Sequence, residues 1–185
     1  VRFGGHVLGG GSTFGRLFTV TTFGESHGGG LGVVIDGCPA GIELDRTAIA
    51  EALARRRPGQ SKFVSNRKEA DEVEILSGLF EGRTLGTPLS MLVRNKDADP
   101  RAYKPFADRY RPSHADFTYE AKHGFRTWQG GGRASARETV ARVAAGAVAA
   151  QVLRCVAPVE CVAWVDRLGG VQAHVDAATV RRAAV

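Results

Sequence analysis

The chain has 185 residues, of which 43% are hydrophobic and 24% charged, and its formal net charge at pH 7 is +6. This composition is that of a soluble globular protein with enough apolar residues for the core of one domain. No apolar run approaches the roughly 20 residues of a membrane-spanning helix. Because Cys38, Cys155 and Cys161 form no disulfide or metal-ligand pattern, we expect reduced thiols, a cytoplasmic location and no metal site.

Residues 1–12 are rich in glycine and match no motif that binds a ligand. They lack both the lysine and the preceding strand of a phosphate-binding loop. We therefore interpret them as a disordered leader or a misassigned translation start, and we expect the folded domain to comprise residues 13–185.

Hydrophobic patterning and turn residues predict the order of elements in that domain. In chain order they indicate strands at 17–23 and 31–35, a helix at 46–56 capped by Asp45, strands at 72–79 and 89–94, a polar loop to Tyr110, a helix at 136–154, a strand at 159–166 and a helix from Asp176. We expect residues 97–105 of the polar loop to be an open segment near the mouth of a site. Short turns between neighbouring strands indicate antiparallel sheets, so the predicted class is α+β.

A histidine lies on the connection between the first two predicted strands. There the sequence reads Gly-Glu-Ser-His-Gly-Gly-Gly, with His27 flanked by glycines. A histidine at a point where backbone can approach a ligand is a candidate for proton transfer near neutral pH. For a lone histidine, a surface side chain in a turn is the more common explanation.

Two further segments carry arginines. In residues 109–116, His114 follows Arg111 and precedes Asp116, and Pro112 favours an extended conformation for Arg111. In residues 55–62, three arginines end the first predicted helix before Pro-Gly. Arginines in a last helical turn are favoured by the helix dipole, so a solvated helix end is the alternative for the second segment.

The fourth segment, residues 130–139, reads Gly-Gly-Gly-Arg-Ala-Ser-Ala-Arg-Glu-Thr. Its glycines allow close approach of backbone amides to a ligand. Ser135 and Glu138 form the pattern of a capping box, which predicts a helix N-terminus. Free amides and the helix dipole favour an anion there, and an ordinary capped helix is the alternative.

Together the four segments resemble one family, chorismate synthase. The resemblance runs from about residue 13 to about residue 153 and is carried by residues 14–28, 55–59, 75–82, 111–116 and 130–147. It implies part of the chorismate synthase βαβ sandwich, in which helices lie between antiparallel sheets and four subunits form a homotetramer.

The same resemblance implies an activity. It implies a lyase that removes phosphate and a ring proton from 5-enolpyruvylshikimate 3-phosphate by anti-1,4-elimination. The product, chorismate, is made in the final step of the shikimate pathway of aromatic amino acid biosynthesis. The resemblance also implies reduced FMN (FMNH2) as cofactor, although the reaction is redox-neutral, and NADPH as reductant in bifunctional relatives.

The resemblance further implies roles for single residues. His27 matches the histidine that protonates the departing phosphate, and His114 matches the histidine placed against the reduced flavin. The positions that match substrate contacts are Ser26, Arg56, Arg111 and Arg137. The positions that match cofactor contacts are Arg56 and Lys62, for a nicotinamide nucleotide, and Arg133, Ala134 and Ser135, for flavin.

The chain departs from the family pattern in places. Ser113 stands where many relatives carry glycine, so its turn must tolerate a Cβ. Gln129 and Lys62 stand where many carry arginine, and lysine lacks the planar fork. The chain covers roughly the first half of the pattern and lacks the flavin-phosphate stretch and the aspartate of the second half. We therefore expect a fragment that is inactive alone.

The positive charge also permits other functions. A basic domain can bind nucleic acid, but these arginines follow glycine loops and helix ends, and aromatic residues are too sparse for base stacking. Anionic small molecules explain the charge better, so we expect no nucleic-acid or membrane partner. A remnant that binds nothing tightly is the third possibility.

Overall fold

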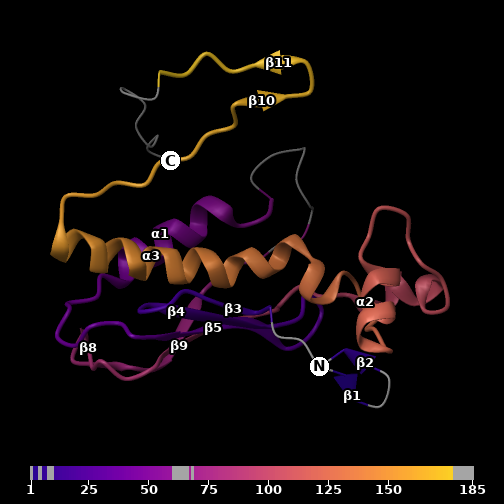
Figure 1. Cartoon of the computed structure of the whole chain (residues 1–185), viewed down its shortest axis with the longest axis horizontal. Helices are drawn as coiled ribbons and strands as arrows, with labels where there is room; N and C mark the ends of the chain where they lie inside the picture. The colour runs from indigo at the N-terminus through magenta and orange to yellow at the C-terminus, as the bar shows by residue number, and fades with distance from the viewer. Residues whose placement is uncertain (1, 4–5, 8–10, 60–66, 68, 177–185) are drawn as a thin grey trace.

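The computed structural model describes residues 2–3, 6–7, 11–59, 67 and 69–176. Its centre is a five-stranded sheet with the strand order β3-β4-β5-β9-β6 (Figure 1). These strands are β3 (Thr13–Phe14), β4 (Thr19–Gly24), β5 (Gly30–Asp36), β9 (Leu89–Arg94) and β6 (Val73–Ser77). All neighbouring strands in the sheet run antiparallel, which together with the helices confirms the predicted α+β class.

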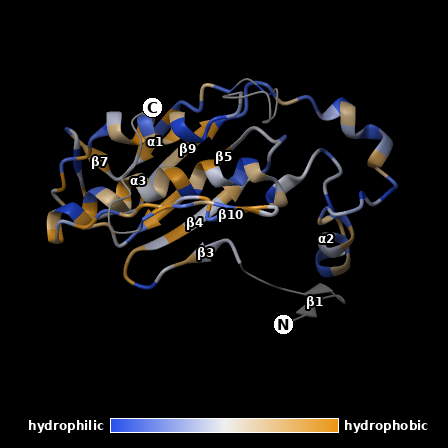
Figure 2. Cartoon of the chain, turned by 90° about the horizontal axis from the view of Figure 1, so that it is seen from above, coloured by the Kyte–Doolittle hydropathy of each residue, from blue (hydrophilic) through white to orange (hydrophobic). Residues whose placement is uncertain are grey.

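Two helices, α1 (Arg46–Arg56) and α3 (Thr139–Val156), pack against each other and cover one face of the sheet (Figure 1). Alternate residues of β5, such as Val33 and Ile35, are fully buried, as the two-residue period of a strand requires. From α3, Val140 and Val148 close the same core. Figure 2 shows the hydrophobic residues along α3 and the strands, and each large buried side chain contributes about 1.5–3 kcal/mol.

Three two-stranded ribbons lie outside this sheet in the described part of the chain. They are β1 (Arg2–Phe3) with β2 (His6–Val7), β7 (Leu79–Phe80) with β8 (Arg83–Thr84), and β10 (Arg167–Leu168) with β11 (Val171–Gln172). The first falls within residues 1–12, the predicted leader. The second arises because Gly78 interrupts the strand predicted at 72–79: its φ is +81°, and a Cβ there would lie 2.6 Å from the Cα of Leu89.

Two predicted elements have the bounds expected from the sequence. α1 begins after Asp45, whose carboxylate accepts hydrogen bonds from the amides of Thr47 (2.8 Å) and Ala48 (3.0 Å). β9 spans Leu89–Arg94 as predicted. The long C-terminal helix begins with a 3₁₀ turn, η3 (Ala136–Glu138), before α3.

Other predictions are wrong. The polar loop after β9 contains a 3₁₀ helix, η1 (Pro100–Phe106), capped by Asp99. A short helix, α2 (Asp116–His123), was not predicted, because the extended conformation that Pro112 favours for Arg111 indicated a loop there. Gly124 ends this helix with a φ of +76°. The described residues 159–166 form no strand, because no neighbouring strand pairs with them. The helix predicted from Asp176 falls on residues 177–185, outside the described residues.

The helical stretch from η3 through α3, Ala136–Val156, is long and apolar enough to cross a membrane by length and composition. The core helix of a soluble protein meets the same criterion. Val140, Ala144 and Val148 are fully buried in the core that α3 shares with the sheet. Burial in the core therefore accounts for part of the apolar character of this stretch, in which an 18-residue window is 33% buried.

We expect Gly146→Ala to raise the free energy of unfolding of this chain by about 0.5–1 kcal/mol, because alanine is the better helix former. An added Cβ at this position in α3 would have nothing within 4 Å. Gly32→Ala should instead destabilise, because its Cβ would clash with the Phe23 ring and lie 2.5 Å from the Met91 carbonyl oxygen. Urea unfolding measures both; effects of the same sign would contradict the packing of β5.

Candidate functional site

His27 lies at the tip of the β4–β5 hairpin, on the glycine-flanked connection that the sequence predicted. β4 ends at Gly24, which pairs with Leu31 and has a φ of +90°, a conformation that glycine adopts without strain. The amide of Gly28 donates to the Glu25 carbonyl (3.1 Å) and closes the turn. The hairpin therefore presents His27 at the end of the sheet.

Three neighbours hold the imidazole of His27. The hydroxyl of Ser26, a residue only 1% exposed, lies 2.9 Å from Nδ1. A Cβ on Gly130 would clash with Nδ1 and Cε1, so the glycine backbone lies directly against the ring. The ring of Tyr103 meets it edge-on, with centroids 4.8 Å apart and an interplanar angle of 71°. Because Nδ1 is engaged, Nε2 is the ring atom that can exchange a proton with a ligand.

The surroundings of His27 lower the pKa of its imidazole from the ordinary value of 6.5. Partial burial is the largest cause, the positive charges of Arg67 and Arg111 act in the same direction, and Asp99 opposes them. The free site therefore favours a neutral imidazole at pH 7. An anion bound beside the ring would raise the pKa and favour uptake of a proton.

Asn95, which directly follows β9, links the hairpin tip to two arginines. Its Nδ2 donates to the carbonyls of Glu25 (2.9 Å) and Gly28 (2.8 Å). Its Oδ1 accepts from Arg67 Nη2 (3.0 Å) and Arg137 Nε (3.2 Å). These contacts use the full hydrogen-bonding capacity of a side-chain amide. Sequence reasoning missed Asn95, because an asparagine after a strand is typical of an ordinary turn.

A cluster of charged side chains lies behind Asn95. Asp71 is shared between Arg137, in a very short ion pair, and Arg56, whose Nη1 lies 2.9 Å away. Glu69 pairs with Arg67 at 2.7 Å and lies 3.8 Å from Arg137. In the described part of the chain, three guanidiniums thus face two carboxylates, and these five side chains together carry one excess positive charge.

The pKa values of two members of this cluster, Glu69 and Arg56, depart from their ordinary values. Burial alone would raise the pKa of Glu69, but the amides of Lys96 and Asp97 and the Arg67 guanidinium hold it below its ordinary value. Burial lowers the pKa of Arg56. Glu69 therefore stays ionised and holds Arg67 in place. Lys62, predicted together with Arg56 to contact a nicotinamide nucleotide, lies outside the described residues.

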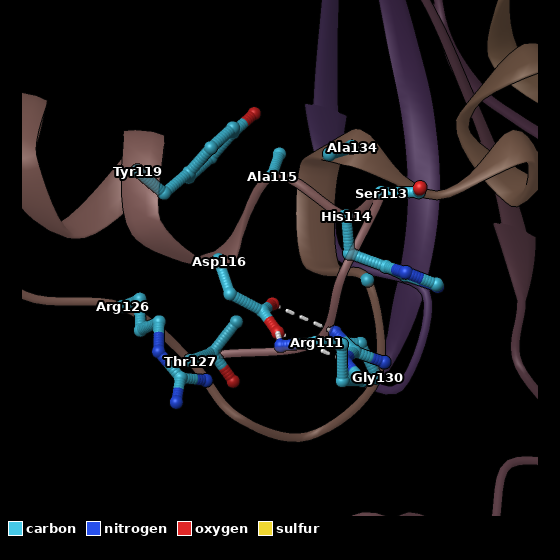
Figure 3. Close-up of a pocket in the computed structure, with 11 residues that line it drawn as sticks. Arg111, Ser113, His114, Ala115, Asp116, Tyr119, Arg126, Thr127, Gly130 and Ala134 are labelled. Carbon is cyan, nitrogen blue, oxygen red and sulfur yellow. Dashed lines mark hydrogen bonds and ion pairs between the residues drawn. The ribbon is translucent and has the colours of Figure 1, made fainter. Parts of the chain in front are cut away.

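Arg111 and Asp116 brace the turn that carries His114. Nε and Nη2 of Arg111 donate to the two oxygens of Asp116 (2.9 and 2.8 Å), and Nη2 also donates to the Gly130 carbonyl (3.0 Å) (Figure 3). This fork holds the pKa of the Asp116 carboxyl well below its usual range. Ser113 has a φ of +62°, so its Cβ occupies a backbone conformation that favours glycine.

A cavity of about 400 Å³ opens beside this turn (Figure 3). Its walls include His114, Arg126, Gly130 and Ala134. Arg126 is buried, and among the described residues its Nη1 has no hydrogen-bond acceptor. The volume is in the range of small-molecule sites, about 300–1,000 Å³. Gly130 lines this cavity and also contacts His27, so one backbone segment joins the two histidines' surroundings.

The segment before α3 differs from a capping box. Ser135 caps η3, and its Oγ accepts from the Arg137 amide at 3.3 Å. The predicted helix N-terminus is confirmed, but Glu138 does not make the reciprocal bond to Ser135 that a capping box requires. Its carboxylate accepts instead from Thr22 Oγ1 of β4 (2.7 Å) and Arg142 Nε (2.9 Å), because the sheet lies beside it. Arg133 also points to β4 and donates to Thr22 Oγ1 at 2.6 Å.

The predicted site residues therefore form two groups in the described structure. Ser26, His27, Arg56 and Arg137 belong to one network that Asn95 and Arg67 connect. Arg111, His114 and Ala134 line the cavity. Arg133 and Ser135 lie on the glycine segment between the two groups, where they brace β4 and η3.

Acid should destabilise the Arg111–Asp116 brace. A carboxyl whose folded pKa is depressed stabilises the protein above its unfolded pKa, and that contribution is lost as the pH falls. We expect Asp116→Asn to lower the free energy of unfolding by about 1–3 kcal/mol at pH 7 and to weaken its dependence on acid below about pH 4. Urea unfolding at pH 7 and pH 3 measures this.

Asp108→Asn is the matched control, because Asp108 is exposed and meets Arg109 only at 3.7 Å. It should change stability by less than about 0.5 kcal/mol. If both variants lose the same free energy of unfolding, the ion pair between Arg111 and Asp116 does not stabilise the fold.

Comparison with known proteins gives a consistent result. A family model described as chorismate synthase matches residues 18–184. The chorismate synthase of Thermosynechococcus vestitus is 61% identical over 175 residues, which are 95% of this chain and 48% of that relative. The Trichormus variabilis enzyme is 62% identical over 170 residues, 92% of this chain and 47% of its own length.

A solved structure titled "Crystal Structure of Chorismate Synthase" matches with a TM-score of 0.57 and 36% identity, over 76% of this chain and 35% of that one. The chain spans about half the length of the curated relatives it matches. The family match includes the β4–β5 hairpin, the arginine cluster and the glycine segment. The chain belongs to the chorismate synthase family.

Proposed function

We propose that this chain supplies the His27 half of a chorismate synthase active site. The reaction removes phosphate and a ring proton from 5-enolpyruvylshikimate 3-phosphate by anti-1,4-elimination and yields chorismate. The observation that carries the proposal is that Nδ1 of His27 is engaged, which leaves Nε2 for a ligand. The hairpin that presents this ring is hydrogen-bonded to Arg67, directly and through Asn95.

In this proposal His27 is the general acid for the departing phosphate. The approach of the phosphate dianion raises the pKa of the imidazole, which then carries a proton on Nε2 and gives it to the leaving oxygen. Ser26 keeps the ring oriented through Nδ1. Arg56 and Arg137 hold the substrate's anionic groups, since guanidinium groups stay charged and bind such groups through two hydrogen bonds.

The cavity beside His114 fits the ring system and polar edge of a flavin. It is lined by the glycine segment, it has a suitable volume, and the buried Nη1 of Arg126 has no acceptor among the described residues. His114 and Ala134 would contact the flavin, with Arg133 and Ser135 holding the segment beneath it. When bound, reduced FMN supplies electron density that eases the loss of phosphate and is recovered afterwards.

The remaining parts of the proposal concern the whole protein. Arg56, with Lys62, would contact NADPH where a relative also reduces the flavin. We propose a homotetramer in the cytoplasm, as the family resemblance implies. Nucleic-acid binding loses support, because Arg56, Arg111 and Arg137 form internal ion pairs and no exposed stripe.

We expect His27→Ala to lower kcat by about 10²–10⁴-fold, the usual worth of general acid catalysis. The protein to test is this chain joined to the remaining C-terminal part of the Thermosynechococcus vestitus relative, assayed anaerobically for chorismate with reduced FMN. The affinity for FMN should change little. An unaltered kcat would rule out His27 as the acid.

The unjoined 185-residue chain is a further arm of that assay. It should show no turnover, because it covers only about half of the relatives' length and a displacement of about 1 Å in a site can cost ~10²-fold. Turnover by the chain alone would show that the second half is dispensable. His174→Ala is the control, because His174 lies far from the cluster in the sequence, and it should leave kcat of the joined protein unchanged.

Arg56→Ala should raise KM for the substrate by about 10–100-fold, the worth of one hydrogen bond to a charged group. Arg56→Lys should restore this only in part, because lysine lacks the planar fork. The joined protein and initial-rate kinetics again provide the measurement, with thermal unfolding recorded because Arg56 also holds Asp71. Arg46→Ala, at the exposed start of the same helix, is the control. If Arg56→Lys leaves KM unchanged, Arg56 serves only its structural ion pair with Asp71.

A further inference from the structure

Tyr103 is an aromatic residue in contact with two of the proposed site residues. Its ring meets the His27 imidazole edge-on, at 4.8 Å between centroids. The guanidinium carbon of Arg111 lies over the same ring, 5.4 Å from its centroid. Tyr103 is thus the side chain that touches both the hairpin group and the cavity group.

The 3₁₀ helix η1 that carries Tyr103 is capped at its start and held by another segment at its end. At its start, the Asp99 carboxylate accepts from the Arg101 amide (3.0 Å) and pairs with the Arg101 guanidinium (2.8 Å). At its end, Nη2 of the buried Arg126 donates to the carbonyls of Phe106 (2.8 Å) and Ala107 (3.2 Å). A ring on so short and braced a segment has little freedom to leave His27.

The contacts of Tyr103 are made by its ring. Among the described residues, no hydrogen bond involves its hydroxyl, and its ring neighbours are the His27 imidazole and the Arg111 guanidinium. Edge-to-face ring pairs and cation–π contacts both depend on the aromatic ring, and phenylalanine provides one as well.

We propose that Tyr103 is a positioning residue for His27, whose ring keeps the imidazole on Ser26 with Nε2 facing the ligand and shields it from water. This assignment rests on the proposed function only for its effect on turnover. The geometry of the ring pair itself is independent of the reaction.

The proposal predicts the titration of His27. Partial burial is the largest cause of its low pKa, and the charged groups that act on the ring are Arg67, from the segment before β6, Arg111, from the turn before α2, and Asp99, at the start of η1. Removal of the Tyr103 ring admits water and removes none of these charges, and Arg111 remains held by Asp116. The pKa should then rise toward 6.5.

The experiment is an NMR pH titration of the His27 ring in this 185-residue chain, compared between the parent and the variants Tyr103→Phe, Tyr103→Leu and Tyr103→Ala. Tyr103→Phe should keep both the pKa and the ring-current shift of His27. Tyr103→Leu and Tyr103→Ala should raise the pKa and abolish that shift. Leucine fills much of the space, so it decides the question if the alanine variant fails to fold.

The matched control is Tyr119→Ala, because Tyr119 pairs with a different histidine, His123, at 5.6 Å. It should abolish the ring-current shift at His123 and leave the titration of His27 unchanged. If folded Tyr103→Leu leaves the His27 pKa and chemical shifts as in the parent, the proposal is wrong. It is also wrong if Tyr103→Phe has the same effect as Tyr103→Leu, since the ring would then not be the acting group.

A kinetic arm uses the joined protein. Tyr103→Leu should lower kcat by up to about 10²-fold with a smaller change in KM, because misplacement of a reacting group costs turnover more than binding. Tyr103→Phe should restore kcat. If the NMR results hold but no variant of the joined protein makes chorismate, the proposed function fails while the positioning role of Tyr103 stands.

Discussion

The side-chain amide of Asn95 is the contact on which the site depends most. It holds two carbonyls of the β4–β5 turn on one side and two guanidiniums on the other. The orientation is determined, since a flipped amide would set its NH₂ group against both arginines and its oxygen against both carbonyls. Because Asn95 directly follows β9, the register of the sheet fixes where the turn meets the charged cluster.

That register also explains why the site forms at this end of the sheet. β4 and β5 end in a tight turn where Gly24 faces Leu31, and β9 lies beside β5 with Arg94 opposite Gly30. The turn and the residue after β9 are therefore neighbours by backbone pairing alone. The helix layer adds Arg137 from η3, because α3 packs on β5 in the shared core. Burial of apolar residues thus assembles polar groups that are far apart in sequence.

Local signals in the sequence were sufficient for much of this arrangement. The Asp45 cap and the paired apolar residues gave α1 its bounds, and the glycines around His27 indicated the hairpin turn. The positive φ of Ser113 also agrees with the expectation that its turn must tolerate a Cβ. In each case one short segment contains the whole cause, so the pattern can be recognised without knowledge of the fold.

The wrong and missing predictions concern contacts between residues that lie far apart in the sequence. Glu138 matches a capping box locally, but its partner Thr22 is 116 positions away in the sequence. Asn95 and Tyr103 carry no motif, and their importance comes only from what the fold sets beside them. Residues 159–166 show the converse: their composition favours a strand, but a strand needs a partner, and the described chain provides none. Long-range pairing decides these cases, and one sequence does not reveal it.

Carboxylates within the fold give the arginines of this chain a geometry before any ligand arrives. Asp71 holds Arg56 and Arg137, and Asp116 holds Arg111 by its fork. A guanidinium that is already fixed loses less side-chain entropy when an anion binds. The carboxylates also reduce the local positive charge, which limits repulsion among the arginines. An anion bound beside the Arg56 cluster would also raise the low pKa of His27.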